Sequence, residues 1–216
     1  MNKILEDAIN KRYNLAGPRV VEALKKRFFD AYYIEHSADV ITKVLELIPH
    51  TDTVSWGGSM TIDSLGIKDV LKEKGYKLLD RSTASNPKEC ENILKQSLTC
   101  DTFLMSRNAI TEDGQLYNID GNGNRVAALI FGPKQVIVIA GMNKVVQNIE
   151  EAYARVRHYA APVNAQRFNL DTPCCKTGEC ANCLSPNSIC AQMVTTRICK
   201  PAKRIKVILV GETLGM

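Results

Sequence analysis

Strands and helical segments alternate along most of this chain, from about residue 29 to residue 160. The run QVIVIA at 135–140 shows no apolar–polar alternation, which is typical of a parallel strand covered on both faces. The pattern predicts an α/β fold with a mostly parallel sheet flanked by helices. Residues 161–202 lack the pattern, are rich in Pro, Cys, Asn and Thr, and precede a clean strand at 204–210. We therefore expect a Cys-rich insertion near the C-terminus, after which the chain returns to the sheet.

The boundaries of the predicted elements follow from periodicity and from capping residues. The first 30 residues are expected to form two helices, because Pro18 suits the first turn of a second helix. Strands are expected at 29–34, 53–56, 76–79 and 102–106, and helices at 38–48, 87–98, 126–131 and 143–159. We divide the 216 residues into N-terminal helices at 1–30 and an α/β domain at 31–212, which includes the Cys-rich segment at 170–200.

Composition excludes several classes of protein. With 45% hydrophobic and 24% charged residues, the chain is neither disordered nor fibrous. No apolar run approaches the roughly 20 residues that a membrane helix needs, and the opening MNKILEDAINKR does not resemble a secretory signal, so we expect no membrane span and a cytoplasmic protein. The net charge of +5 is mild, and the basic run at 197–206 has no interleaved aromatics, so no nucleic-acid partner is predicted.

Six of the eight cysteines lie in one short segment, and cytosolic thiols rarely form disulfides. The six are Cys174, Cys175, Cys180, Cys183, Cys190 and Cys199. Counted from Cys175 the spacing is C-x4-C-x2-C, as in plant-type iron–sulfur proteins, and counted from Cys174 the first gap is one residue longer. Four thiolates suit an iron–sulfur cluster or a zinc ion, and both remain open, as does the choice between Cys174 and Cys175. The basic side chains at 197–206 either offset the charge of such a cluster or form a solvated strand end.

Two glycine-rich loops are candidates for a ligand site. The first, at 57–61, follows a predicted strand and opens a helix, where backbone amides and the hydroxyls of Ser59 and Thr61 can bind an anion. The second, at 113–125, can bring Asp120, Asn124 and Arg125 into a cleft. Each loop taken alone is equally well explained as a tight turn. Because loops at strand ends of one α/β sheet converge on one crevice, we predict a shared site for a small anionic metabolite.

Three stretches of this sequence resemble the LUD domain family, the lactate-utilisation or LutC-like proteins. They are WGGSMT at 56–61, NAITEDGQLYNIDGNGNRVAALIFGPKQVIVIAGMNKV at 108–145 and KVILVGETLG at 206–215, and the resemblance covers about residues 2–212. It implies a fold similar to that of the NagB/RpiA/CoA-transferase-like group, which includes ribose-5-phosphate isomerase. It also implies two pocket walls, one of Gly57, Gly58, Ser59 and Thr61, the other of Asp113, Asn118, Asp120, Gly121, Asn124 and Arg125.

The Cys-rich segment resembles one found in a subset of that family. The subset carries Pro-Cys, Thr-Gly-x-Cys-x-x-Cys, Ser-Pro and Ile-Cys in this order. The match implies that the metal ligands are Cys174, Cys180, Cys183 and Cys190, and that Cys175 is an extra thiol. The simplest members of the family lack this insertion.

Two functions are consistent with these features. In the first, Arg125 pairs with a small carboxylate, and a cluster, expected to be 4Fe-4S, passes electrons to a redox partner protein during lactate or hydroxy-acid utilisation, so that the protein is an oxidoreductase component. In the second, the protein is an isomerase-like or CoA-transferase-like enzyme with Asp120 as general base, or a ligand-binding regulatory module, with zinc in a structural role. A homodimer is expected for this fold.

Overall fold

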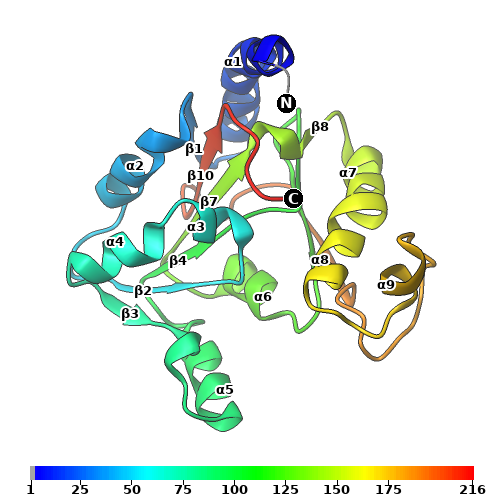
Figure 1. Ribbon diagram of the computed structural model, residues 1–216. Helices are drawn as coiled ribbons and strands as arrows, with labels where there is room; N and C mark the ends of the chain where they lie inside the picture. Colours follow the sequence, from blue (N-terminus) through cyan, green and yellow to red (C-terminus); the bar gives the residue numbers. More distant parts are fainter. Residues whose placement is uncertain (1–2) are drawn as a thin grey trace.

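The computed structural model describes residues 3–216 and contains a central parallel sheet with helices on both of its faces (Figure 1). The strand order is β1-β10-β7-β4-β2-β3, and every neighbouring pair is parallel. The strands are β1 (Asp30–Ile34), β2 (Thr53–Trp56), β3 (Lys77–Leu79), β4 (Thr102–Met105), β7 (Gln135–Gly141) and β10 (Ile205–Val210). The predicted α/β class with a mostly parallel sheet is therefore confirmed.

The central strands are buried on both faces, which explains the unbroken apolar run in β7. Val136 and Val138 pack into one hydrophobic core with α1 (Lys3–Lys26) and α6 (Asn124–Phe131). Ile137 and Ile139, which alternate with them, pack into a second core on the opposite face. That second core is covered by α2 (Val40–Leu47), α3 (Met60–Ser64) and α4 (Ile67–Glu73). Between β3 and β4, the helix α5 (Pro87–Gln96) begins where predicted, with Asn86 as its cap.

The two helices predicted for the N-terminus form one continuous helix, α1, with Pro18 inside it. A proline removes one backbone hydrogen bond from a helix interior and usually kinks or ends it. Here the helix continues because its buried face extends on both sides of the proline, from Tyr13 to Leu24, within the core that also holds Val138. The unit predicted at 1–30 therefore shares the core of the unit predicted at 31–212, and residues 1–2 lie outside the described part.

A second, four-stranded sheet stands beside the first, with the order β8-β5-β6-β9. Its strands are β5 (Ala109–Thr111), β6 (Leu116–Asp120), β8 (Val145–Val146) and β9 (Gln192–Thr196). The helix predicted at 143–159 was wrong at its start, because Val145 and Val146 pair with β5 as an edge strand. Asn148 then caps α7 (Ile149–Arg155), which continues through a π-helical turn (Val156–Ala160) into α8 (Ala161–Arg167).

The Cys-rich segment extends from α8 and forms an outlying lobe (Figure 1). It begins with the short helix α9 (Pro173–Thr177) and then runs without further regular structure to β9. The chain does return to the central sheet, as predicted, but only after pairing with β6. Its last strand, β10, lies between β1 and β7. None of the helices within residues 3–216 has the length and apolar character needed to cross a membrane.

Candidate functional site

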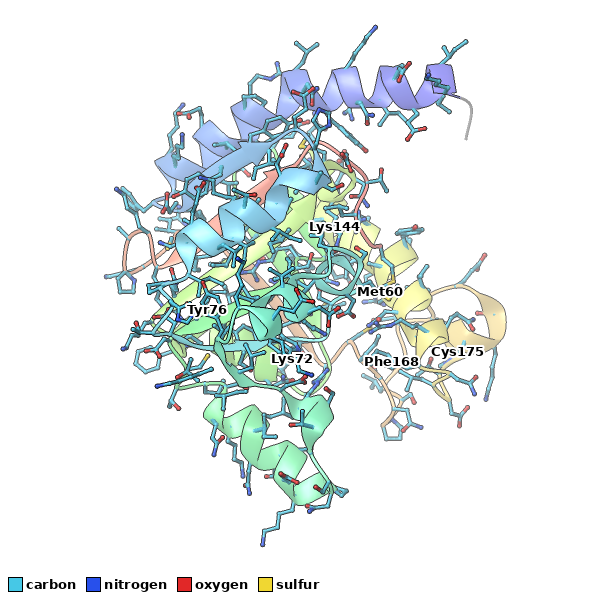
Figure 2. The ribbon with its side chains drawn as sticks, turned by 60° about the vertical axis from the view of Figure 1, so that its left-hand side comes forward. Met60, Lys72, Tyr76, Lys144, Phe168 and Cys175 are labelled. Carbon is cyan, nitrogen blue, oxygen red and sulfur yellow. The ribbon has the colours of Figure 1, made fainter. Side chains whose placement is uncertain are left out.

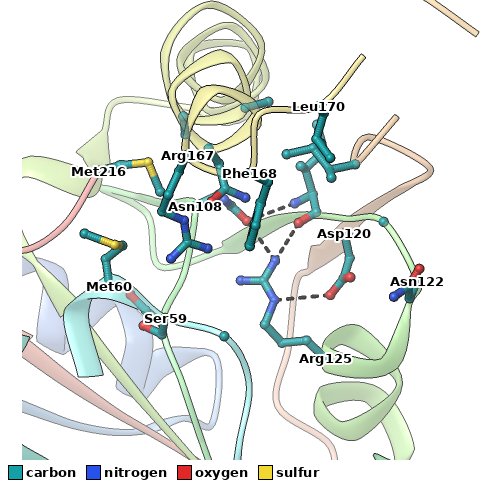
Figure 3. A pocket seen from close by; sticks show the side chains of 18 of the residues that line it. Ser59, Met60, Asn108, Asp120, Asn122, Arg125, Arg167, Phe168, Leu170 and Met216 are labelled. Carbon is teal, nitrogen blue, oxygen red and sulfur yellow. Dashed lines mark hydrogen bonds and ion pairs between the residues drawn. The ribbon is translucent and has the colours of Figure 1, made fainter. Parts of the chain in front are cut away.

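A cavity of about 400 Å³ opens at the carboxyl ends of the central strands, between the sheet and the α8 region (Figure 3). After β2 the chain adds β3 on one side of β2 in the sheet, and after β4 it adds β7 and β10 on the other side of β4. The direction in which successive strands are added therefore reverses between the neighbouring strands β2 and β4. Ligands of open α/β sheets bind at such a reversal. Gly58 follows β2, Arg107 follows β4 and Lys144 follows β7, and all three line the cavity.

The lining side chains give the cavity a strong positive charge. Its cationic side chains are Arg81, Arg107, Arg125, Lys144 and Arg167, whereas Asp120 is its one acidic side chain within residues 3–216. Clefts lined by charges of one sign concentrate ligands of the opposite sign. The predicted preference for an anion therefore has a physical basis in this cavity.

Arg107 is the most deeply buried of these cations. Its side chain is 2% exposed, and Nε, Nη1 and Nη2 have no hydrogen-bond partner in the described part of the chain. Burial, with a contribution from the charge of Arg125, lowers the pKa of Arg107 well below its usual range. A guanidinium nevertheless keeps its proton in proteins, so the charge of Arg107 lacks hydrogen-bonded compensation within residues 3–216.

Lys144 is also buried in the wall of this cavity and is held by two hydroxyl groups. Its Nζ donates to Thr61 Oγ1 at 2.9 Å and to Ser106 Oγ at 3.0 Å. Burial lowers the pKa of Lys144 to about 7, and the charges of Arg155 and Arg125 add to this effect. A bound anion would reverse that shift by pairing with the ammonium.

Arg125 and Asp120 form an ion pair in the cavity wall, with 3.1 Å between Arg125 Nε and Asp120 Oδ2 (Figure 3). Arg125 Nη2 also donates to the Asn108 side chain and to the Ile119 carbonyl. Gly57 makes this position possible, because a Cβ atom there would lie 2.9 Å from Arg125 Cδ. The two residues predicted to be catalytic are thus brought together, and they engage each other; their roles toward a ligand stay predictions.

The structure places most of the other predicted ligand-binding residues at this cavity. They are Gly58, Ser59, Thr61, Gly121 and Asn124. Ser59 also caps α3 by accepting a hydrogen bond from the Ile62 amide at 3.3 Å. This amide is therefore engaged within the helix.

Three predicted residues do not line the cavity. Gly57 donates its amide to the Leu104 carbonyl and supports Arg125 from behind. Asn118 is fully buried within β6. Asp113 was wrongly placed in the wall, because it lies before β6 whereas Asp120 ends that strand. The Asp113 carboxylate pairs with Arg27 at the end of α1. A strand of five residues spans about 17 Å, which separates the two carboxylates.

Sequence reasoning missed several of the strongest cavity residues. Ser106, Arg107 and Asn108 directly follow β4, and Lys144 ends the short 3-10 turn (Met142–Lys144) that follows β7. Their position at the carboxyl ends of parallel strands was the available signal. The residue types themselves gave no signal, since most arginines and lysines in proteins are exposed.

A second, smaller cavity of about 150 Å³ lies in the Cys-rich lobe and is lined by four cysteines. They are Cys174, Cys180, Cys183 and Cys190, the set implied by the family resemblance; Cys175 is not among the lining residues. All eight cysteines are free. Within residues 3–216 no three potential ligands converge tightly enough to hold a single metal ion. Four thiols at one cavity match the number of ligands of an iron–sulfur cluster and of a zinc ion, and the choice between the two stays a prediction.

One buried cation, Arg157, faces these thiols. It lies in the π-helical turn and is 7% exposed, and its Nε donates to Cys180 Sγ at 3.0 Å. Its other nitrogens donate to Tyr153 Oη and to Asn182 Oδ1. The hydrogen bond with Cys180 raises the pKa of Arg157. No sequence signal distinguished this arginine within its helical segment.

Two side chains of the basic run at 197–206 have partners other than cysteines, and the choice between the two roles predicted for the run stays open. Arg204 donates to the carbonyls of Ala128, Leu129 and Pro133, and Lys206 approaches Asp30 at 3.4 Å. Arg157 contacts a thiol of the lobe directly.

The two cavities adjoin. Ala161, Ser188 and Ile189 line both of them, so a single layer of residues separates the cationic cavity from the cysteines. Figure 2 shows the lobe, with Cys175, on the same side of the molecule as the cavity residues Phe168 and Met60.

Comparisons with known proteins agree with this architecture. The sequence profile of the LUD domain family matches residues 17–210. A DUF162 family protein from Deinococcus radiodurans, known from a crystal structure, shares the fold with a TM-score of 0.56 and 12% identity, over 92% of this chain and 98% of that chain. Ribose 5 phosphate isomerase A from Neisseria gonorrhoeae (TM-score 0.34, 14% identity, 58% and 65% covered) and eIF2B delta from Chaetomium thermophilum (0.36, 13%, 54% and 51%) are more distant. No curated protein matched the chain.

Proposed function

Because the chain belongs to the LUD domain family, we propose that it binds a small carboxylate of the lactate or hydroxy-acid class in the cationic cavity, beside a [4Fe–4S] cluster. In this proposal Cys174, Cys180, Cys183 and Cys190 hold the cluster. The observation that carries it is the wall of Ala161, Ser188 and Ile189, which the two cavities share. A ligand in one cavity would lie within one residue layer of a redox group in the other.

The residues of the cationic cavity provide what a carboxylate requires. Arginine binds carboxylates through two parallel N–H donors, and Arg107 has all of its donors free of partners within residues 3–216. Thr61 and Ser106 add hydroxyl groups next to the Lys144 ammonium. These groups would bind and orient the ligand and displace water from it.

The residues of the cysteine cavity fit a thiolate-ligated cluster. Such a cluster, when bound, carries one electron at a time. Arg157 would offset part of the thiolate charge through its hydrogen bond with Cys180. The free thiols also support a cytoplasmic location, where cysteines stay reduced.

Electron balance makes the protein one component of a larger system. Oxidation of a hydroxy acid to an oxo acid releases two electrons and two protons, which is more than one such cluster accepts. We therefore propose that the protein is an oxidoreductase component that delivers electrons one at a time to a redox partner protein.

The first test is anaerobic purification followed by an absorption spectrum and iron, sulfide and zinc analysis. We expect about four irons and four sulfides per chain and a broad band at about 400 nm that bleaches on reduction. Colourless protein with about one zinc per chain would contradict the electron-transfer function and make the lobe a structural zinc site.

Two cysteine variants test the ligand set. Cys183→Ser should remove the metal, because Cys183 lines the cavity, whereas the matched Cys175→Ser should keep full metal content. If Cys175→Ser lost the metal and Cys174→Ser kept it, Cys175 would be the ligand and Cys174 the extra thiol.

A further inference from the structure

We propose that Lys144 is a nucleophilic lysine whose amine forms an imine with the carbonyl carbon of a 2-oxo acid bound in the cationic cavity. The inference goes beyond the proposed function, which assigns no covalent chemistry to Lys144, and it does not depend on the cluster. The ligand class is a small carbonyl compound with a carboxylate next to the carbonyl group.

The Lys144 amine is fixed in the cavity wall by two uncharged groups. Nζ donates to Thr61 Oγ1 at 2.9 Å and to Ser106 Oγ at 3.0 Å, and all three residues line the cavity. These two hydroxyls are its hydrogen-bond partners within residues 3–216, so no carboxylate holds the amine as an ammonium ion. A Cβ atom at Gly215 would come within 3.3 Å of Nζ, and the lack of a side chain there leaves room beside the amine.

The surroundings of this amine favour its neutral, nucleophilic form. Burial lowers the pKa of Lys144 to about 7, and the positive charges of Arg155 and Arg125 add to this effect. Lysines that form imines with carbonyl substrates are activated in this way, by burial or by a neighbouring cation. At pH 7 about half of the molecules then have a neutral amine, against fewer than about one in a thousand for an ordinary lysine.

The other charged groups of the cavity select an acid among carbonyl compounds. The excess of cationic over acidic side chains attracts a carboxylate. Arg125 can bind this carboxylate through parallel N–H donors, and it lies close enough for its charge to act on Lys144. A carboxylate on Arg125 would hold an adjacent carbonyl group in the same cavity as the amine. In a 2-oxo acid the two groups are direct neighbours.

Imine formation balances without a further reactant. The lone pair on Nζ forms the C–N bond as the carbonyl π bond breaks, and one amine proton moves to the oxygen to give a carbinolamine. The second amine proton leaves with the hydroxyl group as water, so that the C–O bond breaks and the C=N bond forms. Ser106 is placed to carry these protons, because its oxygen accepts from Nζ and its own hydrogen has no acceptor within residues 3–216.

The experiment is reductive trapping of the purified protein with pyruvate and cyanoborohydride at pH 7, followed by trypsin digestion and mass spectrometry. Hydride converts the imine into a stable secondary amine, and the lysine gains the mass of the acid less one oxygen atom. Trypsin does not cleave after a lysine modified in this way. We therefore expect the peptide 135–155 to remain uncut at Lys144 and to carry the added mass.

Lys134 is the control within the same digest, because it directly precedes this peptide. Its side chain is 83% exposed, and its hydrogen bond with Asp101 raises its pKa. We expect at least about 100-fold more adduct at Lys144 than at Lys134, since the neutral fraction of Lys134 is far smaller at pH 7.

A second ligand and two variants test the roles of the carboxylate and of the amine. Methyl pyruvate keeps the ketone but masks the carboxylate, and it should be trapped at least about tenfold more slowly than pyruvate, which is the effect of one charge-assisted contact. Lys144→Arg keeps the positive charge but cannot form an imine, and Lys144→Met removes both. The adduct should be lost in both variants.

Three outcomes would overturn the proposal. Equal adduct at Lys134 and Lys144, or none at either, would show that Lys144 is not a reactive amine. Equal trapping of pyruvate and methyl pyruvate would remove the acid from the ligand class. An adduct of unchanged amount in both Lys144 variants would assign the reaction to another lysine. An adduct at Lys144 in colourless protein would support this inference while contradicting the electron-transfer function.

Discussion

The two cavities share a wall, yet the chain builds them in opposite ways. The cationic cavity takes Gly58, Arg107 and Lys144 from the ends of three adjacent strands, whose positions the hydrophobic cores hold. The cysteine cavity takes its sulfurs from residues 174–190, where the helical residues end at Thr177. A site on rigid strands is formed before its ligand arrives, whereas an irregular segment gains a fixed shape from what its side chains bind together.

Under the proposed function the two regions also carry unbalanced side-chain charge of opposite sign. The first has an excess of cations, with Asp120 as its acidic side chain within residues 3–216. The second would hold four thiolates in its ligated form, with Arg157 as the cation in contact. Under the proposed function each region would be stabilised by the group it binds, an anion in the first and a cationic metal centre in the second.

The largest expected effect comes from removing the metal. Chelation or Cys183→Ser should make the segment 178–191 sensitive to limited proteolysis, because few backbone hydrogen bonds hold it. The central sheet should remain folded, since β7 and β10 lie between the two hydrophobic cores. Cleavage sites located by mass spectrometry, together with hydrogen exchange of the strands, measure this difference.

If the lobe resisted proteolysis as well after metal removal as before it, the segment would be rigid by itself. That result would contradict the expected difference between the two regions. Unfolding of the whole protein would also contradict this difference, because the stability of the sheet would then depend on the lobe. Cys175→Ser provides the control, since Cys175 does not line the cavity.

The next effect concerns Arg157. Arg157→Gln removes a positive charge and the hydrogen bond to Cys180 Sγ, both of which favour the more electron-rich, reduced state of a bound cluster. We expect the reduction potential to fall by roughly 40 mV, which corresponds to about 1 kcal/mol for a one-electron couple. Redox titration followed by absorbance measures the midpoint.

Tyr153→Phe is the matched control for this arginine. It removes the hydroxyl that accepts from Arg157 Nη1 but keeps the contact of Nε with Cys180. Its midpoint should stay close to that of the unchanged protein. A potential that is unaltered in Arg157→Gln would show that the hydrogen bond does not act on the cluster.

A smaller effect is the pH dependence of ligand binding. Lys144 has its pKa lowered to about 7 by burial and by Arg155 and Arg125, and its other neighbours, Thr61 and Ser106, are uncharged. An anion that pairs with Lys144 raises this pKa, so binding takes up a proton above pH 7 and none well below it. Affinity should therefore fall as pH rises from 7, by at most about tenfold per pH unit.

Calorimetry at pH 8 in two buffers with different ionisation enthalpies measures the proton uptake directly. We expect up to one proton per ligand in the unchanged protein and none in Lys144→Met. In the ligand-free protein the sign is reversed: the lowered pKa means that Lys144 makes folding more favourable as pH rises from about 7 toward about 10. Equal uptake in Lys144→Met would assign the proton to another group.

How much the sequence revealed differs between the two regions for physical reasons. The spacing predicted a group of thiols in this segment but left Cys174 and Cys175 open, and the family resemblance implied the four that line the second cavity. Buried apolar strands such as β7 were also predicted from the sequence. The burial of Arg107 and Lys144 was not predicted, because a buried arginine or lysine cannot be told from an exposed one by sequence alone. The single helix through Pro18 likewise depends on tertiary packing on both sides of the proline.

The smallest expected effect concerns Asp113, which the family resemblance placed in the ligand site. Its side chain is 52% exposed and it pairs with Arg27 at the end of α1, on a different part of the second sheet from Asp120. Asp113→Asn should change the free energy of unfolding by less than about 1 kcal/mol, because exposed ion pairs contribute little. Ligand affinity should be unchanged, in contrast to Asp120→Asn, which frees Arg125 from its partner in the cavity wall. Denaturant unfolding and calorimetry of the two variants measure both quantities, and a clear loss of affinity in Asp113→Asn would return this carboxylate to the site.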